Sequence, residues 1–235
     1  MAGDPARIPR IAAHFHDAEP VADHRGYVSW RGMLGGVRVG AVSHGIGAPS
    51  AAIVAEELAR AGVRTVIRLG TAGGIAPGVR AGDLVVPVAA LRHDGLTAAY
   101  LPPEYPALAD PLLVTVLEGA ARDLGLRVHV GLVETKDSFY GQVDRDSSPM
   151  RDALARDWKV MTEAGVLATE MECSALFVVG AVRRMRTAAI VKVMVNQNLD
   201  PHEVVEGDDD LVRAGVLGLE RIILRDRRLD RGPAA

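Results

Sequence analysis

Short apolar runs alternate with helical repeats along most of this chain. Runs rich in β-forming residues predict strands at residues 37–43, 63–69, 83–90, 128–133 and 188–195. Helical periodicity predicts helices at residues 51–61 with Ser50 as their cap, at 111–124, at 158–165, from Glu172 through Ala181, and at 209–224. This alternation predicts a single α/β domain over residues 1–224, with a central mixed β-sheet flanked by helices. The tail, residues 225–235, is rich in Arg, Asp and Gly and is expected to fray.

Glycine and polar residues mark the expected loops. Residues 70–74 are expected to form a tight glycine-rich turn after a strand, and residues 141–152 a long polar loop. Sheets of α/β domains bind ligands beyond the carboxyl ends of their strands. The turn predicted at residues 70–74 is therefore a candidate ligand site.

Composition and charge exclude several classes of function. The net charge is −3, so the chain has no general electrostatic attraction for nucleic acid or an anionic membrane. Cys173 is the only cysteine, which excludes an internal disulfide and a multi-cysteine metal site. No apolar run approaches the ~20 residues of a membrane span, and the N-terminus lacks the layout of a signal peptide. We therefore expect a cytoplasmic protein without a bound metal.

An arginine beside small and hydroxylated residues is the first candidate for chemistry. Arg68 is followed by Gly70 and Thr71, so a guanidinium, a hydroxyl and accessible backbone N–H groups suit an oxyanion. The segment from Gly3 to Arg7 is the second candidate, because a turn that opens a helix presents N–H groups to an anion. A surface turn and a frayed terminus are the structural alternatives to these two interpretations.

Two acids before an apolar helix form the third candidate. Glu170 and Glu172 flank Met171 at the predicted helix start. Acids at this position complement the helix macrodipole, which is a purely structural role. A carboxylate there also suits the 2′ and 3′ hydroxyls of a ribose.

An aromatic, amide and guanidinium group forms the fourth candidate. Phe139, Gln142 and Arg145 lie close together in sequence and offer groups that can read the edge of a flat heterocycle. A polar loop needs no such function, so both interpretations stay open here. His44 lies beside Gly45 on an expected loop, where a lone histidine is usually neither acid nor base.

Taken together, these segments resemble the nucleoside phosphorylase family, and specifically its uridine phosphorylase branch. The motifs occur in the family's order over nearly the whole chain: GDPARI, SWRGML, SHGIGAPSAAIVAEEL, GVRTVIRLGTAGGI, GDLVVP, RHDGLTAAYLPPEYPALAD, KDSFYGQ and ATEMECSAL. The resemblance implies a pentosyltransferase that converts a pyrimidine nucleoside such as uridine into ribose 1-phosphate and free base. It implies no cofactor, with inorganic phosphate as the co-substrate.

The resemblance also implies roles for individual residues. The phosphate pocket corresponds to Gly3, Arg7, Arg68 and Thr71, together with Arg25 from a neighbouring subunit. The ribose site corresponds to Thr71, Glu170, Met171 and Glu172, and the base site to Phe139, Gln142 and Arg145. Arg68 and Glu172 are expected to carry catalysis through positioning and electrostatics. The implied assembly has a homodimer as its active-site unit and is a trimer of dimers.

Several positions depart from the family pattern. Arg145 lies three positions after Gln142 instead of two, and Gln197 stands where the family has a stabilising arginine. Gly26 stands where related enzymes carry an acid of a monovalent-cation site, so no potassium dependence of that kind is expected. Asn196 stands near the acid that protonates the leaving base in the purine-cleaving branch, which favours a pyrimidine.

Alternatives remain at this point. Within the family they are a purine nucleoside phosphorylase and a nucleosidase that uses water, and outside catalysis a nucleoside-binding homologue. The base and the tolerance for 2′-deoxyribose are not fixed by the sequence. Family members carry an apolar strand and a histidine before the GDP motif, whereas here Met1 and Ala2 lead directly into Gly3. We therefore expect an upstream start that supplies both.

Overall fold

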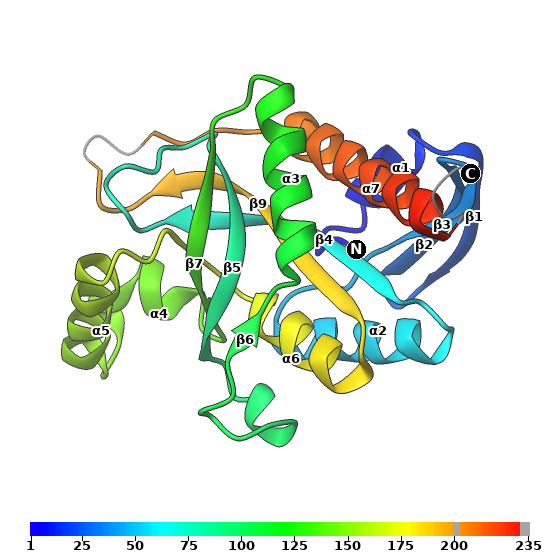
Figure 1. Ribbon diagram of the computed structural model, residues 1–235. Helices are drawn as coiled ribbons and strands as arrows, with labels where there is room; N and C mark the ends of the chain where they lie inside the picture. Colours follow the sequence, from blue (N-terminus) through cyan, green and yellow to red (C-terminus); the bar gives the residue numbers. More distant parts are fainter. Residues whose placement is uncertain (200–202, 231–235) are drawn as a thin grey trace.

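The computed structural model describes residues 1–199 and 203–230 (Figure 1). Its strands are β1 (His16–His24), β2 (Tyr27–Leu34), β3 (Val37–Val42), β4 (Thr65–Gly74), β5 (Leu84–His93), β6 (Ala107–Leu108), β7 (Val128–Lys136), β8 (Ala168–Glu170) and β9 (Arg186–Asn196). Its α-helices are α1 (Arg7–Ala12), α2 (Ala48–Arg60), α3 (Pro111–Asp123), α4 (Tyr140–Val143), α5 (Arg151–Glu163), α6 (Cys173–Arg183) and α7 (Asp209–Asp230). Two short 3-10 helices are η1 (Thr97–Ala99) and η2 (Arg145–Ser147).

Six strands form the main sheet, in the order β6-β5-β7-β8-β4-β9, and a further pairing of β5 with β9 closes the sheet on itself. Neighbours β4 and β9, β5 and β7, and β7 and β8 run parallel, whereas β8 is antiparallel to β4. Helix α2 packs against α6 at the bottom of Figure 1, and α3 packs against α7 in its upper half. The predicted α/β class, a mixed central sheet flanked by helices, is confirmed.

Helix α6 lies in the interior. Its residues from Cys173 to Gly180 are all buried, as expected for a helix that is apolar on every face. It ends at Arg183, and the C-cap residue Arg184 adopts the left-handed conformation at φ 55°. Among the described residues, no helix has the length and apolar character needed to cross a membrane.

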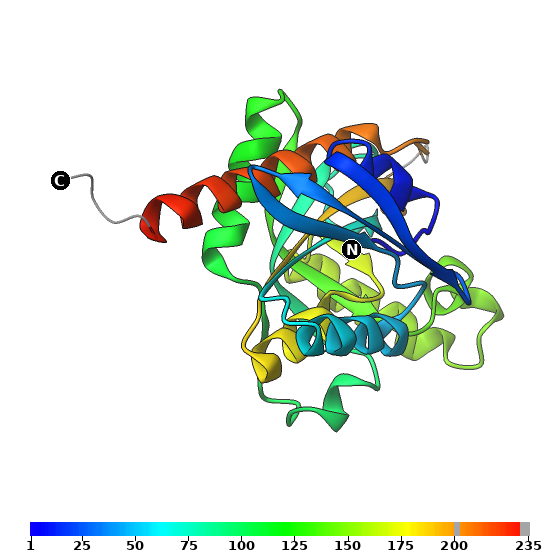
Figure 2. The ribbon, with the colours of Figure 1, turned by 90° about the vertical axis from the view of Figure 1, so that its right-hand side faces the viewer.

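A second, three-stranded sheet has the order β1-β2-β3 and lies beside the main sheet, toward the viewer in Figure 2. Only β3 was predicted. Strand β1 is exposed along almost its whole length and carries charged and polar residues, so it has no apolar face for a pattern to reveal. The two-residue turn between β1 and β2 places Arg25 and Gly26 at positive φ, the geometry that twisted hairpins favour.

The first residues of the chain lie between the two sheets. Ala2 forms parallel bridges with both Ser43 and Leu69. Its N–H donates to the Val42 carbonyl at 3.0 Å, and the Leu69 N–H donates to the Met1 carbonyl at 2.9 Å. Met1 and Ala2 thus connect the end of β3 with β4 through backbone hydrogen bonds.

The turn predicted at residues 70–74 is instead the second half of β4. These small residues pair with β9, and Gly73 and Gly74 also pair with β8. A Cβ on Gly70 would lie 2.1 Å from Arg68 Nη1, and one on Gly74 would lie 2.8 Å from Asn196 Nδ2. Glycines are needed here because larger neighbouring side chains fill the space beside the strand.

Two predicted boundaries are corrected. Helix α2 begins at Ala48 with Gly47 as its N-cap, and Ser50 lies inside the helix, where its Oγ donates to the His44 carbonyl. Helix α7 continues to Asp230 instead of ending at 224. Arg186 pairs with Asp226, and Arg227 Nη1 donates to the Gly35 carbonyl at 2.5 Å, so tertiary contacts hold the extra turns. The remainder of the predicted tail, residues 231–235, lies outside the described residues.

The polar loop predicted at residues 141–152 is largely helical. Helix α4 and the 3-10 helix η2 occupy half of it, and α5 begins at Arg151. Helix α5 buries only Trp158 and Met161, so its first half lacks the apolar repeat that revealed its second half. This segment brings Gln142 back over the end of β7.

Candidate active site

A buried ion pair lies at the centre of the candidate site. Arg68, on β4, contacts Glu172, at the N-cap of α6, through Nη2 and Oε2. Arg68 Nη1 also lies 3.4 Å from Glu170 Oε2. Burial acts against the charge of Arg68, yet the two carboxylates together hold its pKa above the ordinary arginine value. The structure therefore joins the two residues expected to carry catalysis.

Glu172 has a second partner on a glycine-rich loop. Its Oε1 accepts a hydrogen bond of 2.6 Å from the Gly47 N–H, directly before α2. Gly47 has a φ of 90°, a conformation that favours glycine. Both carboxylate oxygens of Glu172 thus contact groups that belong to other elements, and the loop and β4 fix its position.

Glu170 has a different environment from Glu172. Its carboxylate accepts hydrogen bonds from the N–H of Glu172 at 2.8 Å, from the N–H of Cys173 at 2.9 Å and from Thr135 Oγ1. It therefore satisfies the free amides at the start of α6. Met171, between the two acids, is half-buried. Glu170 is positioned to hold the start of α6. Of these two acids, Glu172 makes the shorter contact with Arg68.

The predicted phosphate residues are brought together only in part. Arg7 is buried on α1, and its Nη1 donates to the Leu69 carbonyl at 2.9 Å, next to Arg68 in sequence. Thr71, farther along β4, is half-buried. Arg25 lies at the exposed tip of the β1–β2 hairpin. Among the described contacts, Arg25 has no ion pair or hydrogen bond to the residues of this pocket.

One acid at the phosphate end was not predicted. Asp208 is buried and contacts Arg7 Nε and Arg10 Nη1. It lies 201 positions after Arg7 in the sequence, so no local motif connects the two residues. Asp208 balances the charge of Arg7, and a phosphate at Arg7 would lie close to this carboxylate.

The base-reading candidate Gln142 belongs to a buried polar cluster. Its Nε2 donates to Glu134 Oε2 at 2.5 Å. Thr169 Oγ1 lies 2.8 Å from Glu134 Oε2 and 3.1 Å from Gln142 Oε1. Lys136 Nζ donates to Thr169 Oγ1 at 2.6 Å, and His93 Nδ1 lies 2.9 Å from Glu134 Oε1. The amide orientation of Gln142 is therefore fixed by its neighbours.

Charges within this cluster shift one another's pKa values. Burial opposes the charge on Glu134, but hydrogen bonds from His93, Gln142 and Thr169 hold its pKa below the ordinary glutamate value. The hydrogen bond with Glu134 raises the pKa of His93. Burial lowers the pKa of Lys136, and the nearby carboxylates oppose that shift. The cluster is thus a set of coupled charges around Gln142.

Phe139 and Arg145 lie at the edge of this cluster. Phe139 is 52% exposed and meets Tyr140 edge to face, with ring centroids 5.4 Å apart. The guanidinium carbon of Arg145 lies 5.0 Å from the centroid of the Trp158 ring. Among the described contacts, Arg145 has none with Gln142. Arg145, which lies three positions after Gln142 instead of two, thus stacks on Trp158 of α5.

Lys136, Glu134 and Thr169 were missed by the sequence interpretation. Lys136 and Glu134 end strand β7, which was predicted to stop at Val133. Charged residues directly after an apolar strand run are the signal that identifies such positions, because strand ends face the ligand edge of the sheet. Among the described residues, no group of His, Cys, Asp and Glu is arranged to hold a metal ion.

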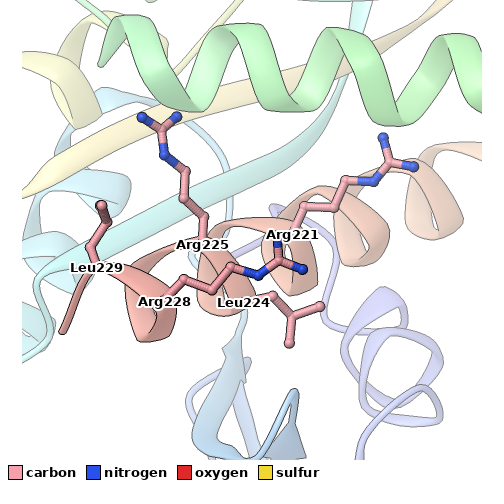
Figure 3. A pocket seen from close by; sticks show the side chains of 5 residues that line it. All are labelled: Arg221, Leu224, Arg225, Arg228 and Leu229. Atoms are coloured by element: carbon pink, nitrogen blue, oxygen red, sulfur yellow. The ribbon is translucent and has the colours of Figure 1, made fainter. Parts of the chain in front are cut away.

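A separate surface groove lies on α7. It is lined by Arg221, Leu224, Arg225, Arg228 and Leu229, as Figure 3 shows. Arg221 pairs with Asp123 of α3 at 2.8 Å. The groove is formed by exposed and half-exposed side chains of one helix and shares no residue with the Arg68 cluster.

Comparison with known proteins gives matches over nearly the full chain. Residues 1–221 match the Phosphorylase superfamily. The uridine phosphorylase of Treponema pallidum is 38% identical over 230 residues, which cover 96% of this chain and 89% of the relative. The uridine phosphorylase of Escherichia coli is 38% identical over 201 residues, 83% of this chain and 78% of the relative. The guanosine phosphorylase of Halorubrum lacusprofundi is 36% identical over 221 residues, 94% of this chain and 87% of the relative.

Proposed function

Because this chain belongs to the phosphorylase superfamily, we propose that it is a nucleoside phosphorylase, a pentosyltransferase that uses inorganic phosphate as its acceptor. Uridine is the proposed nucleoside, and ribose 1-phosphate and uracil are the products. The observation that carries the proposal is the buried contact of Arg68 with Glu172. It places a cation suited to phosphate directly beside a carboxylate suited to a ribose diol.

When the substrates bind, phosphate contacts Arg68 and the ribose hydroxyls contact Glu172, so each residue gains a new partner in place of the other. A phosphate beside Arg68 supplies negative charge that replaces part of the contribution of Glu172. The 2′ and 3′ hydroxyls of the ribose then donate to Glu172, which the Gly47 N–H keeps in place through Oε1. Glu170 holds the start of α6 throughout, because its carboxylate is bound to backbone amides.

The reaction follows from this arrangement of charges. The bond between C1′ and the base nitrogen stretches, its electron pair goes to the base, and positive charge develops on the sugar. The departing base takes up a proton from solvent and leaves as neutral uracil. Phosphate held by Arg68, Arg7, Thr71 and the Gly3 backbone stabilises that charge from one face and then forms the new bond to C1′. Rate enhancement comes from positioning and electrostatics, which together can account for several orders of magnitude.

The Gln142 cluster forms the base side of the site. A uracil presents one N–H donor and two carbonyl acceptors, and an amide with a fixed orientation can pair with both kinds of group. Glu134 supplies that orientation by accepting from Gln142 Nε2. The Lys136 ammonium, two residues along β7, stabilises negative charge on the departing base, while Arg145 stacks on Trp158.

A purine nucleoside is the second candidate substrate, because one relative is named a guanosine phosphorylase. The contacts of Asn196 argue against a purine substrate. Its Nδ2 donates to the carbonyls of Ala76 at 2.8 Å and Val79 at 2.7 Å, so the side chain is engaged in holding a loop. An amide with these partners has no proton to offer a leaving purine.

We further propose a homodimer as the active-site unit, assembled as a trimer of dimers in the cytoplasm. Arg25 supports the dimer, because it is exposed at a hairpin tip and lies outside the pocket of its own chain. A neighbouring copy would then supply Arg25 to the phosphate that Arg68 binds.

A phosphorolysis panel tests the proposed substrate. Uridine, thymidine, inosine, guanosine and adenosine are incubated with the full chain and phosphate, and the free base is measured. Uridine is expected to give the highest kcat/KM. Preferential cleavage of guanosine or inosine would move the assignment to the purine branch, and binding of uridine without turnover would contradict catalysis.

A further inference from the structure

His44 is a buried side chain without a hydrogen-bond partner. It follows β3 and its side chain and backbone are fully buried. Its backbone is well satisfied, since the N–H donates to the Ala2 carbonyl at 2.8 Å and the carbonyl accepts from Ser50 Oγ. Both ring nitrogens nevertheless lack a partner among the described residues. Buried polar groups in native proteins are nearly always paired, so this ring requires an explanation.

The ring lies at the phosphate end of the candidate site. Its Cε1 is 3.6 Å from the position that a Cβ would take on Gly3. Arg68 Nε is a further buried side-chain nitrogen without a partner in the described part of the chain. The positive groups that act on His44 are Arg68, the Met1 amino group and Arg7. Unpaired nitrogens of His44, after β3, and of Arg68, on β4, therefore belong to a part of the molecule where Arg68, Arg7 and the Met1 amino group act on the His44 ring.

The protonation state of His44 is set by the same surroundings. Burial first, and then the charge of Arg68, lower its pKa to about 2. A neutral imidazole has one N–H donor and one acceptor nitrogen. Among the groups that act on the ring, the Gly45 backbone raises its pKa and the others are cations, so an anion beside the ring would meet a neutral N–H donor in cationic surroundings.

We propose that His44 is a further phosphate-binding residue, whose ring N–H donates to the phosphate held against Gly3 and Arg68. Phosphate oxygens accept several hydrogen bonds each, so one phosphate can accept from the His44 ring N–H as well as from Arg68. The inference rests on the proposed function and adds a contact that the predicted set of Gly3, Arg7, Arg68, Thr71 and Arg25 does not contain. His44 also leads into the loop of Gly47, which binds Glu172, so it connects the phosphate and ribose sides of the site.

Steady-state kinetics test this contact. His44→Leu replaces the ring with an apolar side chain of similar size that has no hydrogen-bond donor. His44→Gln restores a donor. We expect the KM for phosphate to rise about tenfold or more in His44→Leu, as for the loss of one hydrogen bond to a charged group, and to recover partly in His44→Gln. The KM for uridine should change less than twofold. His14→Gln, at an exposed histidine, is the matched control.

A spectroscopic measurement on the wild-type chain covers the case in which a variant fails to fold. Inorganic phosphate is titrated into wild-type protein labelled with ¹³C and ¹⁵N, and the His44 ring signals are assigned through their correlation with the His44 backbone resonances. A saturable shift of these signals with phosphate, absent with chloride, supports the contact. Unmoved ring signals, or a phosphate KM unchanged in folded His44→Leu, overturn it. Uridine cleavage that needs no phosphate would instead overturn the proposed function itself, so the two failures are distinguishable.

Discussion

Arg68 and Glu172 are 104 positions apart in the sequence, yet their side chains form an ion pair in the interior, at the junction of β4 and α6. Each is the principal charged partner of the other. When phosphate binds Arg68 and the ribose hydroxyls bind Glu172, the two side chains can separate without leaving either charge unpaired.

Glu172→Gln is expected to lower kcat/KM for uridine about a hundredfold or more, while the fold is retained. Two hydrogen bonds from ribose to a carboxylate contribute roughly 1.5–3 kcal/mol each, and an amide replaces only part of this. Glu170 remains beside Arg68 and keeps that charge compensated. Glu57→Gln, in an exposed pair with Arg60, is the control. A folded Glu172→Gln variant with near-normal kcat/KM would show that Glu172 does not bind ribose and serves only at the start of the helix.

Lys136→Met is expected to lower kcat for uridine at least tenfold. The variant keeps the length of the side chain but removes the cation near Gln142, and with it the stabilisation of charge on the departing base. The KM for phosphate should stay within about twofold, because phosphate binds at the other end of the site. Lys159→Met is the matched control, since Lys159 is 75% exposed on α5. Equal losses in both variants, or none in either, would show that Lys136 has no specific role.

The His93–Glu134 pair is expected to make stability depend on pH. The pKa of His93 is raised above 6.5 in the folded chain, so its contribution is present below about pH 6.5 and is lost as the pH rises through the folded value. The pKa of Glu134 is lowered below 4.5, so its contribution is lost only as the pH falls through that lower value. The pair therefore contributes most between about pH 4.5 and 6.5.

Thermal unfolding of His93→Gln measures this contribution. The Tm difference from wild type should be larger at about pH 5.5 than at about pH 8.5. The effect is expected to be small, because the His93 side chain is 47% exposed and solvent screens the pair. His14→Gln should show no such dependence. A difference that grows with pH would have the wrong sign for this pair.

Mixed variants test the shared site. Arg25→Ala and Arg68→Ala are each expected to be inactive alone, because each lacks one phosphate ligand in every pocket. After subunit exchange, a hybrid dimer holds one pocket with both arginines, so activity should return to about a quarter of the wild-type value at most. Light scattering establishes whether the wild type is a dimer or larger. A fully active monomer would contradict the shared pocket.

Sequence patterns predicted the elements that are apolar and regular. Strands β3, β5, β7 and β9 and helices α2, α3 and α6 were predicted within a few residues of their observed bounds, whereas α7 was predicted to end at 224 and continues to Asp230. Strands β1 and β2 were missed because β1 is polar and exposed and β2 is only half-buried over most of its length. The residues after Arg68 were misread as a turn, since glycine marks turns locally but here makes room for Arg68 and Asn196.

The sequence motifs identified the segments that contribute to the candidate site. They could not show which side chains from different segments contact one another. Family motifs identified Arg68, Glu172 and Gln142, and the fold brings the first two into contact. Asp208 contacts Arg7, 201 positions away, so no spacing rule could assign it. Glu134 and Lys136 directly follow an apolar strand run, a signal that was not used. His44 was dismissed as a lone loop histidine, because its burial and its unpaired nitrogens exist only in three dimensions.

The most direct test of the central claim is the phosphate dependence of uridine cleavage by the wild-type chain. Uracil and ribose 1-phosphate are measured together, in buffer with and without inorganic phosphate. We expect the two products to form in equal amounts, at a rate that saturates with phosphate and falls to background without it. Uracil released at the same rate in phosphate-free buffer, with free ribose in place of ribose 1-phosphate, would contradict it.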